Sequence, residues 1–373
     1  FFMLSHYKSA IKDKKSQNLY RDLHDFEILS QINIKKNGRQ LISFCSNDYL
    51  GLAQNHEVKK VAIDVIEKFG VGATASRFIS GNNSLYAILE NELANFKNAD
   101  DSLIFSSGYA CAIGVIPALI DKYDLVITDR LIHSCLIDGI KLSGAKMLRF
   151  KHNDMVHCQK ILQENRSKYK KCLIISESVF SMDGDLGKVD ELLELSQKFN
   201  SLLLIDYAHD LGIDEKPAAE PNFLKMGTLS KSLGALGGYI AGDNILIDYL
   251  RNFSKSLIYS TALPPAILAS AIKSLELLQK GDLGQNALRN AEFFCDLMNL
   301  PKPQSAIIPI IIGDSKKTLE IAQKIEEKGY LISAIRSPTV EKNKDRLRIT
   351  FSAIHELGII RDFQRELVKI IVN

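Results

Sequence analysis

The chain has 373 residues, of which 46% are hydrophobic, and its formal net charge is +3. This length is enough for a large core and, at roughly 150 residues per domain, for two or three domains. The near balance of charge and the lack of a basic tail argue against nucleic acid as a partner. No CxxC pair, metal-spaced histidine cluster, signal peptide or apolar run of membrane-spanning length is present. We therefore expect a cytoplasmic protein with no bound metal and no contact with a membrane.

Residues 1–45 are polar and charged. A helical pattern extends through Tyr7–Leu29, and a short strand is predicted at Leu41–Phe44. We expect this part to be an N-terminal arm and not a free domain.

Residues 46–280 alternate between helical and strand-like segments. Apolar residues recur at helical spacing in Val58–Phe69 and Tyr86–Lys97. Short apolar runs, typical of buried strands, lie at Ser102–Phe105, Leu125–Thr128, Cys172–Ser176, Leu202–Asp206, Met226–Leu229 and Tyr239–Ala241. The alternation predicts an α/β domain with a mainly parallel sheet. Such sheets bind ligands beyond the carboxyl ends of their strands.

Residues 281–373 follow a predicted long helix at Ala266–Gln279. They contain a strand at Ile307–Ile312, a helix at Thr318–Lys328, a strand at Arg346–Phe351 and a final helix. This mixture predicts a smaller α+β domain at the C-terminus.

Lys231 lies between small hydroxyl residues directly after a predicted strand, within Gly227–Gly234. A lysine that forms a Schiff base needs a partly desolvated amine at such a place. The segment is not a phosphate-binding Walker loop, because Gly-x4-Gly-Lys is absent. On this octapeptide alone, a surface lysine in a Ser/Gly-rich loop is an equally good interpretation.

Asp206 ends another apolar strand, 25 residues before the lysine, and His209 follows it. A pyridinium nitrogen needs a carboxylate partner to keep its proton, and Asp206 suits that role. His209 is placed to bond the hydroxyl of the same ring. A helix N-cap is the alternative for Asp206 alone. The combination with Lys231, after a separate strand, favours a pyridoxal-phosphate site.

Three further segments follow the same logic. Ser106–Ala110 opens a helix after a strand, where backbone N–H groups bind phosphate. His133 follows a strand end and is placed to stack on a planar ring, although a lone histidine is often structural. The loop Gly70–Arg77 resembles a dinucleotide fingerprint, but it follows a helix and lacks a third glycine in register. A glycine-rich loop that lines the site is the better interpretation.

In this order the segments resemble the α-oxoamine synthases, fold-type I pyridoxal-phosphate enzymes related to aminotransferases. The resemblance extends from about residue 20 to residue 355. The matching segments are Ser46–Leu52, Gly72–Gly81, Ser106–Ala110, His133-Ser134, Ser178–Asp185, Asp206–His209, Thr228–Lys231, Tyr259–Pro265, Pro338–Val340 and Arg346–Arg348. It implies a large domain with a mainly parallel seven-stranded sheet and a smaller α+β C-terminal domain.

The resemblance also implies roles for particular residues. Lys231 carries the cofactor, pyridoxal 5'-phosphate, and moves the α-proton, while Asp206, His209 and His133 hold the ring. The implied cofactor-binding set is Gly108, Tyr109, His133, Ser181, Asp206, His209, Thr228, Lys231 and Thr261. The implied substrate-binding set is Arg21, Asn47, Ser76, Thr339 and Arg348. Thr261 reaches the phosphate of the neighbouring subunit, which implies a homodimer with shared active sites.

The implied reaction joins an amino acid to an acyl thioester with loss of CO2. Ser107-Gly108-Tyr109 and Tyr259-Ser260-Thr261 are similar to members that join L-alanine to pimeloyl-CoA, or to the pimeloyl group on a carrier protein, in biotin biosynthesis. Glycine C-acetyltransferase is one alternative, and a non-catalytic partner subunit is another. The alternative interpretation as a nicotinamide dehydrogenase rests only on the Gly70–Gly72 loop.

Three departures from the family pattern concern the segment after Asp206. Tyr207 stands where an acidic residue is usual, and Asp210 replaces a small residue. The stretch from His209 to Thr228 is also shorter than usual. The cofactor residues survive, so we expect catalysis to be retained, with an effect on subunit contacts or acyl-chain fit.

Overall fold

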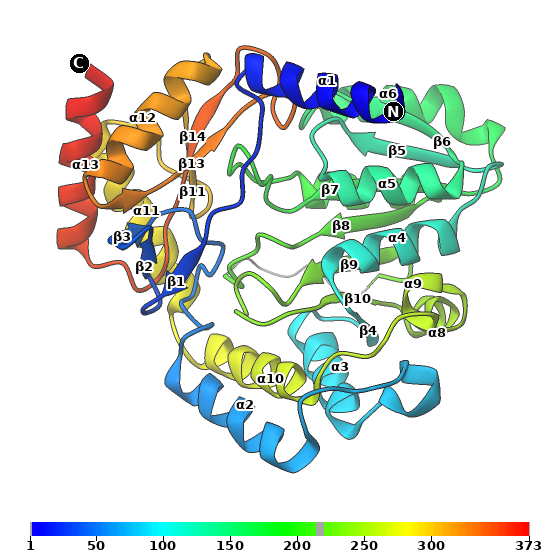
Figure 1. Ribbon diagram of the computed structural model, residues 1–373. Coiled ribbons are helices and arrows are strands. Elements are labelled where there is room, and N and C mark those ends of the chain that lie inside the picture. Colours follow the sequence, from blue (N-terminus) through cyan, green and yellow to red (C-terminus); the bar gives the residue numbers. More distant parts are fainter. Residues whose placement is uncertain (1, 214–219, 373) are drawn as a thin grey trace. The chain divides into compact units, whose positions relative to one another are not determined.

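A computed structural model describes residues 2–213 and 220–372 (Figure 1). The chain forms two compact units. The large unit contains residues 50–181 and 185–284, and the small unit contains residues 1–49, 182–184 and 285–373. The residues of the predicted arm group with the C-terminal part of the chain. The shortened stretch after His209 includes residues 214–219, which lie outside the described residues.

The described part of the large unit forms a seven-stranded sheet in the order β4-β10-β9-β8-β7-β5-β6. The strands are β4 (Asp101–Phe105), β5 (Leu125–Asp129), β6 (Lys146–Phe150), β7 (Cys172–Glu177), β8 (Leu202–Asp206), β9 (Phe223–Thr228) and β10 (Gly238–Gly242). Only β10 pairs antiparallel with its neighbours. The predicted mainly parallel seven-stranded sheet is therefore confirmed. Sequence reasoning missed β6, because this edge strand carries Lys146 and Arg149 and lacks a continuous apolar run.

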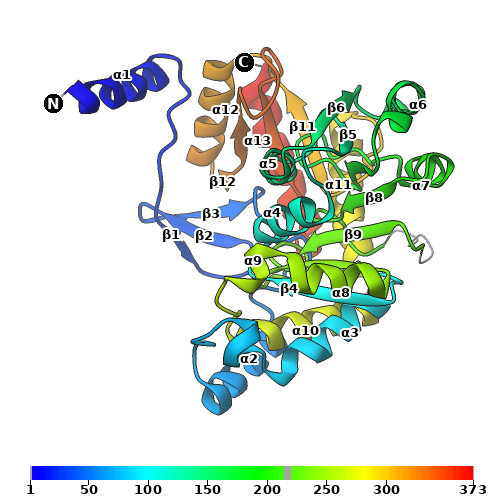
Figure 2. The same cartoon turned by 90° about the vertical axis from the view of Figure 1, so that its right-hand side faces the viewer.

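Helices cover both faces of this sheet (Figures 1 and 2). They are α2 (His56–Phe69), α3 (Ser84–Phe96), α4 (Gly108–Leu119), α5 (Ser134–Ser143), α6 (Met155–Asn165), α7 (Val189–Lys198), α8 (Asn244–Phe253), α9 (Lys255–Ile258) and α10 (Pro265–Lys280). In β5, Val126 packs with the α4 and α5 side chains, whereas Leu125 and Ile127 pack with those of α6 and α7. Successive side chains of a strand point to opposite faces, which is why buried parallel strands read as continuous apolar runs.

The small unit contains two sheets. One has the order β1-β2-β3-β12, and the other has the order β11-β14-β13. The strands are β1 (Phe26–Ile28), β2 (Asn33–Lys36), β3 (Arg39–Ser43), β11 (Ile307–Ile311), β12 (Tyr330–Leu331), β13 (Ser333–Ile335) and β14 (Arg346–Thr350), and the helices are α1 (Phe2–Ser16), α11 (Leu283–Met298), α12 (Ser315–Glu327) and α13 (Leu357–Val372).

The predicted helix through Tyr7–Leu29 is wrong beyond Ser16, where α1 ends. Asn18 has a φ of 55°, a left-handed conformation that asparagine tolerates and that interrupts a helix. Residues Phe26–Ile28 instead pair antiparallel with Ile34–Lys36. Pairing with a second strand, which a local pattern does not reveal, therefore overrides the helical spacing.

His355 is buried in the aromatic core of the small unit. Its ring stacks on Phe44 at a centroid distance of 4.3 Å. Its Nδ1 accepts the backbone N–H of Ser352 at 2.9 Å, so the proton is on Nε2, which lies 3.0 Å from the carbonyl oxygen of Ser43. Burial disfavours the charged form and lowers the pKa of His355 to about 4, against the opposing effect of the hydrogen bond to the Ser43 carbonyl oxygen. A second proton would also convert the Nδ1 acceptor into a donor facing the Ser352 N–H.

Acidification should therefore destabilise the small unit through His355. The histidine of the unfolded chain, with a pKa near 6.5, binds a proton more readily than the folded one. The contribution of His355 to the free energy of unfolding is fully present above about pH 6.5. It is lost as the pH drops toward 4, by roughly 3 kcal/mol. We expect urea unfolding of the wild-type protein to show this loss. In His355→Asn, the free energy of unfolding should depend less on pH. The exposed His24 provides the control, since His24→Asn should keep the wild-type slope. An unchanged slope in His355→Asn would contradict this account.

All six cysteines are free, and five of them are buried. This agrees with the expectation of small apolar core residues. Within residues 2–213 and 220–372, no helix has the length and apolar character needed to cross a bilayer.

Candidate active site

Apart from Thr261, the predicted cofactor residues lie at or after the carboxyl ends of strands in the large unit. Strands β5, β7, β8 and β9 run parallel, so these ends lie along one edge of the sheet. Asp129 ends β5, Glu177 ends β7, Asp206 ends β8 and Thr228 ends β9. Glu177 and Asp206 are direct neighbours in the pairing of β7 with β8. Residues distant in sequence therefore meet at this edge, as the sequence predicted.

Lys231 and His209 are in contact. The Nζ of Lys231 lies 2.9 Å from Nε2 of His209. His209 is buried, and Lys231 is half-buried. The turn that holds His209 is attached to the turn that holds Lys231, because the hydroxyl of Ser232 donates to the carbonyl oxygen of Asp210 at 2.7 Å. This arrangement holds the amine beside an imidazole at the rim of the sheet.

Asp206 is 5% exposed and lies within the electrostatic reach of Lys231. Burial raises the pKa of Asp206 to about 6, against the opposing effects of the positive charge on Lys231 and a 2.9 Å hydrogen bond from the Ala208 N–H. The neighbouring Glu177 has its pKa raised well above the ordinary value by burial and by the negative charge of Asp206. Two buried carboxyl groups at adjacent strand ends resist double ionisation unless a cation lies next to them.

His133 caps the start of α5 at the same edge. Its Nδ1 accepts the backbone N–H of Cys135 at 3.3 Å, and its own backbone N–H donates to Oε1 of Glu177. The ring still reaches solvent, but partial burial and then the positive charge of Lys231 lower its pKa. A neutral ring is the form that accepts at Nδ1 and leaves its face available for stacking.

A second part of the site lies where α4 begins. The Ser107 side chain caps the helix by accepting the N–H of Ala110 at 3.0 Å. A Cβ at Gly108 would lie 3.4 Å from the Cβ of Thr228, and one at Gly238 would lie 2.4 Å from the carbonyl oxygen of Ser107. Both glycines therefore allow close approach of three chain segments. The result is a cluster of backbone N–H groups at the start of a twelve-residue helix, beside the Thr228 hydroxyl.

Tyr109, the next residue of α4, is 47% exposed, and its hydroxyl donates to Oδ2 of Asp138 at 2.7 Å. Ser76 and Thr261 form an isolated antiparallel bridge, and the Ala262 N–H donates to the carbonyl oxygen of Ala75 at 2.9 Å. The loop before Ser76 follows α2, as expected, and not a strand. The structure therefore joins two predicted residues, Ser76 and Thr261, that the chain separates by 185 positions.

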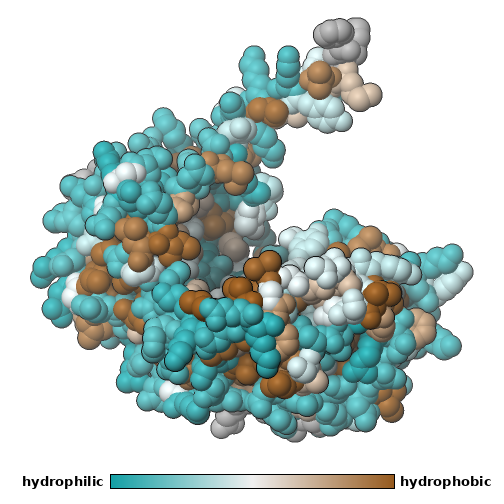
Figure 3. Space-filling view, turned by 60° about the horizontal axis from the view of Figure 1, so that its bottom comes forward, coloured by the Kyte–Doolittle hydropathy of each residue, from teal (hydrophilic) through white to brown (hydrophobic). Residues whose placement is uncertain are grey.

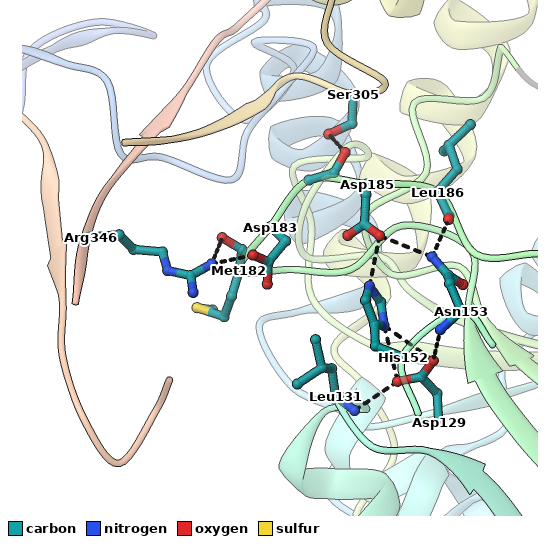
Figure 4. Close-up of polar contacts among 11 residues, drawn as sticks. Asp129, Leu131, His152, Asn153, Met182, Asp183, Asp185, Leu186, Ser305 and Arg346 are labelled. Carbon is teal, nitrogen blue, oxygen red and sulfur yellow. Dashed lines mark hydrogen bonds and ion pairs between the residues drawn. The ribbon is translucent and has the colours of Figure 1, made fainter. Parts of the chain in front are cut away.

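Ser181 lies in a hairpin after β7, in which Val179 pairs with Leu186. Residues 182–184 of the hairpin tip group with the small unit. There Arg346 donates to the carbonyl oxygen of Met182 and pairs with Asp183, and the Ser305 hydroxyl donates to the carbonyl oxygen of Gly184 at 2.8 Å (Figure 4).

The remaining predicted residues form two groups within the small unit. Arg348 is buried and donates to Oδ1 of Asn47 at 3.3 Å and to the Tyr49 hydroxyl at 3.2 Å. Arg21 donates from Nη2 to the Thr339 hydroxyl at 3.0 Å. Thus Asn47 lies with Arg348, and Arg21 lies with Thr339.

Sequence reasoning missed the polar groups that support this site. Glu177 ends an apolar strand just as Asp206 does, so extending the predicted strand by one residue would have found it. Lys97 and Asp210 form a buried ion pair, and the ammonium group lies 4.6 Å from the centre of the Tyr207 ring. No sequence signal identifies Lys97, because its partner is 113 residues away.

These groups fit pyridoxal 5'-phosphate. Lys231 offers an amine, and α4 and Thr228 offer phosphate donors. The buried Asp206, with its raised pKa, calls for a cationic partner, and a protonated pyridine nitrogen is such a group. His133 offers a ring for stacking. The donor set thus meets the requirements of an aromatic ring that carries a phosphate and a basic nitrogen.

Comparison with known proteins agrees with this fold. The protein-family model described as aminotransferase class I and II matches residues 39–361 of this chain. The structure of serine palmitoyltransferase from Sphingomonas wittichii is similar to this one, with a TM-score of 0.91 and 25% sequence identity. The match covers 98% of this chain and 97% of that one. The fold is that of the fold-type I pyridoxal-phosphate transferases. The chain belongs to the class I and II aminotransferase family, and within it to the α-oxoamine synthases.

Relatives with higher sequence identity to this chain are described as 8-amino-7-oxononanoate synthases. The 8-amino-7-oxononanoate synthase of Methylorubrum populi is 42% identical over 86% of this chain and 83% of the relative. That of Treponema denticola is 40% identical over 93% of this chain and 92% of the relative. The solved 8-amino-7-oxononanoate synthase from Francisella tularensis is 27% identical, has a TM-score of 0.75, and the match covers 89% of this chain and 98% of that one.

Proposed function

We propose that this chain is a pyridoxal-phosphate-dependent acyltransferase that makes 8-amino-7-oxononanoate. The substrates are L-alanine and a pimeloyl thioester, and the other products are CO2 and the free thiol. The observation that carries the chemistry is the contact of Lys231 with His209 beside the buried carboxyl of Asp206. The choice of substrates is supported by relatives of that name at about 40% identity over most of the chain.

The residues of the large unit divide the work as follows. Pyridoxal phosphate, when bound, supplies an electron sink for negative charge at the α-carbon of the amino acid. The Nζ of Lys231 takes the α-proton and later returns a proton, and His209, 2.9 Å away, orients that amine. Asp206 holds a proton on the ring nitrogen. His133 covers the ring face and excludes water from it.

The other roles follow from the same proposal. The start of α4 at Gly108, with Thr228, binds the phosphate, and Tyr109 lies at its border. Ser181 also contacts the cofactor. Arg348 and Asn47 bind the carboxylate of the amino acid, since a guanidinium group suits a carboxylate. Arg21, Thr339 and Ser76 contact the acyl substrate.

We also propose a homodimer in which Thr261 serves the site of the partner subunit. Large apolar side chains are exposed around the bridge of Ser76 with Thr261, namely Val71 at 79%, Ile79 at 81% and Tyr259 at 82%. Figure 3 shows brown side chains at several places among teal ones on the face that comes forward. A group of exposed apolar side chains on a monomer is typical of an interface. Sedimentation as a monomer at assay concentrations would contradict the dimer.

The six free thiols support a reducing, cytoplasmic location.

A substrate comparison tests the proposed reaction. Release of free thiol is measured for pimeloyl-CoA with L-alanine and for acetyl-CoA with glycine, at equal concentrations. We expect kcat/KM to favour the first pair at least about tenfold, because several methylene groups contribute to binding. The pimeloyl group on acyl carrier protein, assayed in parallel, decides the carrier. Preference for acetyl-CoA with glycine would instead identify a glycine C-acetyltransferase, and no thiol release with any pair would exclude the synthase.

A further inference from the structure

His152 lies in the turn between β6 and α6 and contacts two carboxylates (Figure 4). Its Nδ1 lies 3.1 Å from both carboxylate oxygens of Asp129, and its Nε2 lies 2.8 Å from Oδ2 of Asp185. A neutral imidazole has only one N–H. Since both ring nitrogens face acceptors, the geometry requires the doubly protonated, positively charged ring.

The electrostatic surroundings favour the same protonation state. Burial acts against the charged form of His152, but hydrogen bonds to Asp129 and Asp185 and the negative charges of these groups outweigh it and raise the pKa to about 10. The ring therefore carries its positive charge at neutral pH. The side chain of Asp129 is fully buried, which makes the contact with the cation costly to remove.

Asp129 connects His152 to the turn that carries His133. It ends β5, and its Oδ1 accepts the backbone N–H of Leu131 at 2.8 Å, two residues before His133. Its Oδ2 also accepts the backbone N–H of Asn153 at 2.8 Å. The carboxylate thus joins the turn after β5 to the turn after β6.

Asp185 connects His152 to the hairpin that carries Ser181. The Phe180 N–H donates to the carbonyl oxygen of Asp185 at 3.0 Å, and the Phe180 ring packs edge-on against His152 at 4.4 Å. The Asn153 side chain adds two hydrogen bonds from Nδ2, to Oδ2 of Asp185 at 3.0 Å and to the carbonyl oxygen of Leu186 at 2.9 Å. His152 therefore contacts both strands of the hairpin.

We propose that His152 is a positioning residue that fastens the turn carrying His133 to the hairpin carrying Ser181. The two loops follow different strands, β5 and β7, and each holds a residue assigned to the cofactor, His133 and Ser181. His152 contacts neither group directly, and it acts through Asp129 and Asp185. The assignment of these two groups rests on the proposed function, whereas the linkage itself is a property of the cofactor-free fold.

Hydrogen–deuterium exchange of the full chain tests the linkage without reference to activity. His152→Phe keeps an aromatic ring against Phe180 but removes both donors. We expect amides of residues 129–133 and 178–187 to exchange at least about tenfold faster, with the amides of β8 and β9 unchanged. The matched control is His157→Phe, because His157 lies on the adjacent helix and contacts neither carboxylate. Wild-type protection of either segment in His152→Phe would overturn the proposal, as would uniform loss of protection across the large unit.

Asp185→Asn separates the two halves of the linkage. The asparagine loses the charge that pairs with His152 but leaves Asp129 in place, so faster exchange is expected in residues 178–187 and not in residues 129–133. Equal effects on both segments would overturn the proposal.

Absorbance titration of cofactor-free protein with pyridoxal phosphate gives the functional readout. We expect His152→Phe to weaken binding at least about tenfold and His157→Phe to leave it unchanged. Wild-type affinity in His152→Phe would overturn the positioning role. If the wild-type protein binds no cofactor, the proposed function fails, and the exchange result still decides the linkage.

Discussion

Lys231→Ala should lose turnover by on the order of 10⁴-fold, which is the upper range for removal of a positioned acid–base group. The variant lacks the amine that lies 2.9 Å from His209, so the α-proton has no acceptor at that place. Thiol release from pimeloyl-CoA with L-alanine measures the effect. The absorbance of the cofactor-loaded protein in the visible region should also change, because the amine that reacts with the cofactor is absent.

A matched lysine variant distinguishes this effect from general damage. Lys122 is exposed on the large unit, and Lys122→Ala should retain both wild-type turnover and the visible absorbance. The unfolding midpoint of each variant is measured in parallel. Undiminished turnover in Lys231→Ala would refute the assignment of this residue and, with it, the proposed mechanism.

Asp210→Ala should be strongly destabilising, by roughly 3–5 kcal/mol, the range for removing one partner of a buried ion pair. The Lys97 side chain is only 3% exposed and the Asp210 side chain 8% exposed, so the variant leaves a buried ammonium group without its carboxylate. The turn that carries His209 depends on the same residue, because the Gly212 N–H donates to Oδ1 of Asp210 at 2.7 Å. Urea unfolding measures the loss, and a smaller turnover should accompany it.

Returning a carboxylate to position 207 should restore part of this stability. The Tyr207 ring centre lies 4.6 Å from the Lys97 ammonium group, so a glutamate at 207 reaches the same cation. The double variant Asp210→Ala with Tyr207→Glu is therefore expected to unfold at a higher urea concentration than Asp210→Ala alone. As a control, Glu164→Ala removes an exposed pair with Lys160 and should change stability little. Equal urea midpoints for the single and double variants would show that a carboxylate at position 207 does not replace that of Asp210 as the partner of Lys97.

This expectation also gives a physical reason for two of the three departures in the segment after Asp206. An acidic residue is usual at 207 in the family that the chain resembles, and here the acidic residue is three positions later. Both positions face Lys97, so the negative charge is retained while the tyrosine ring packs against the ammonium group. The cation is thus matched by a carboxylate without an acidic residue at 207.

Local sequence patterns were sufficient for six of the seven strands of the large sheet, all but β6, and they placed several candidate site residues at strand ends. Five of the predicted strand runs end at or next to residues that the structure places at one sheet edge, because parallel strands in such a sheet share the direction of their carboxyl ends. Asp206 and Lys231 were found because each follows a separate apolar strand. Residues 17–29 were predicted incorrectly, since helical spacing over a polar segment carries no information on the strand that Phe26–Ile28 pairs with.

Only the tertiary structure determined which polar groups support the site. His152 contacts Asp129 and Asp185 across 23 and 33 residues, and Lys97 contacts Asp210 across 113 residues. Periodicity reports the local environment of a segment, whereas a buried charge is specified by a partner that arrives from a different strand or helix. The amino-acid sequence therefore predicted the residues of the proposed cofactor site, and only the folded chain showed which residues hold them in place.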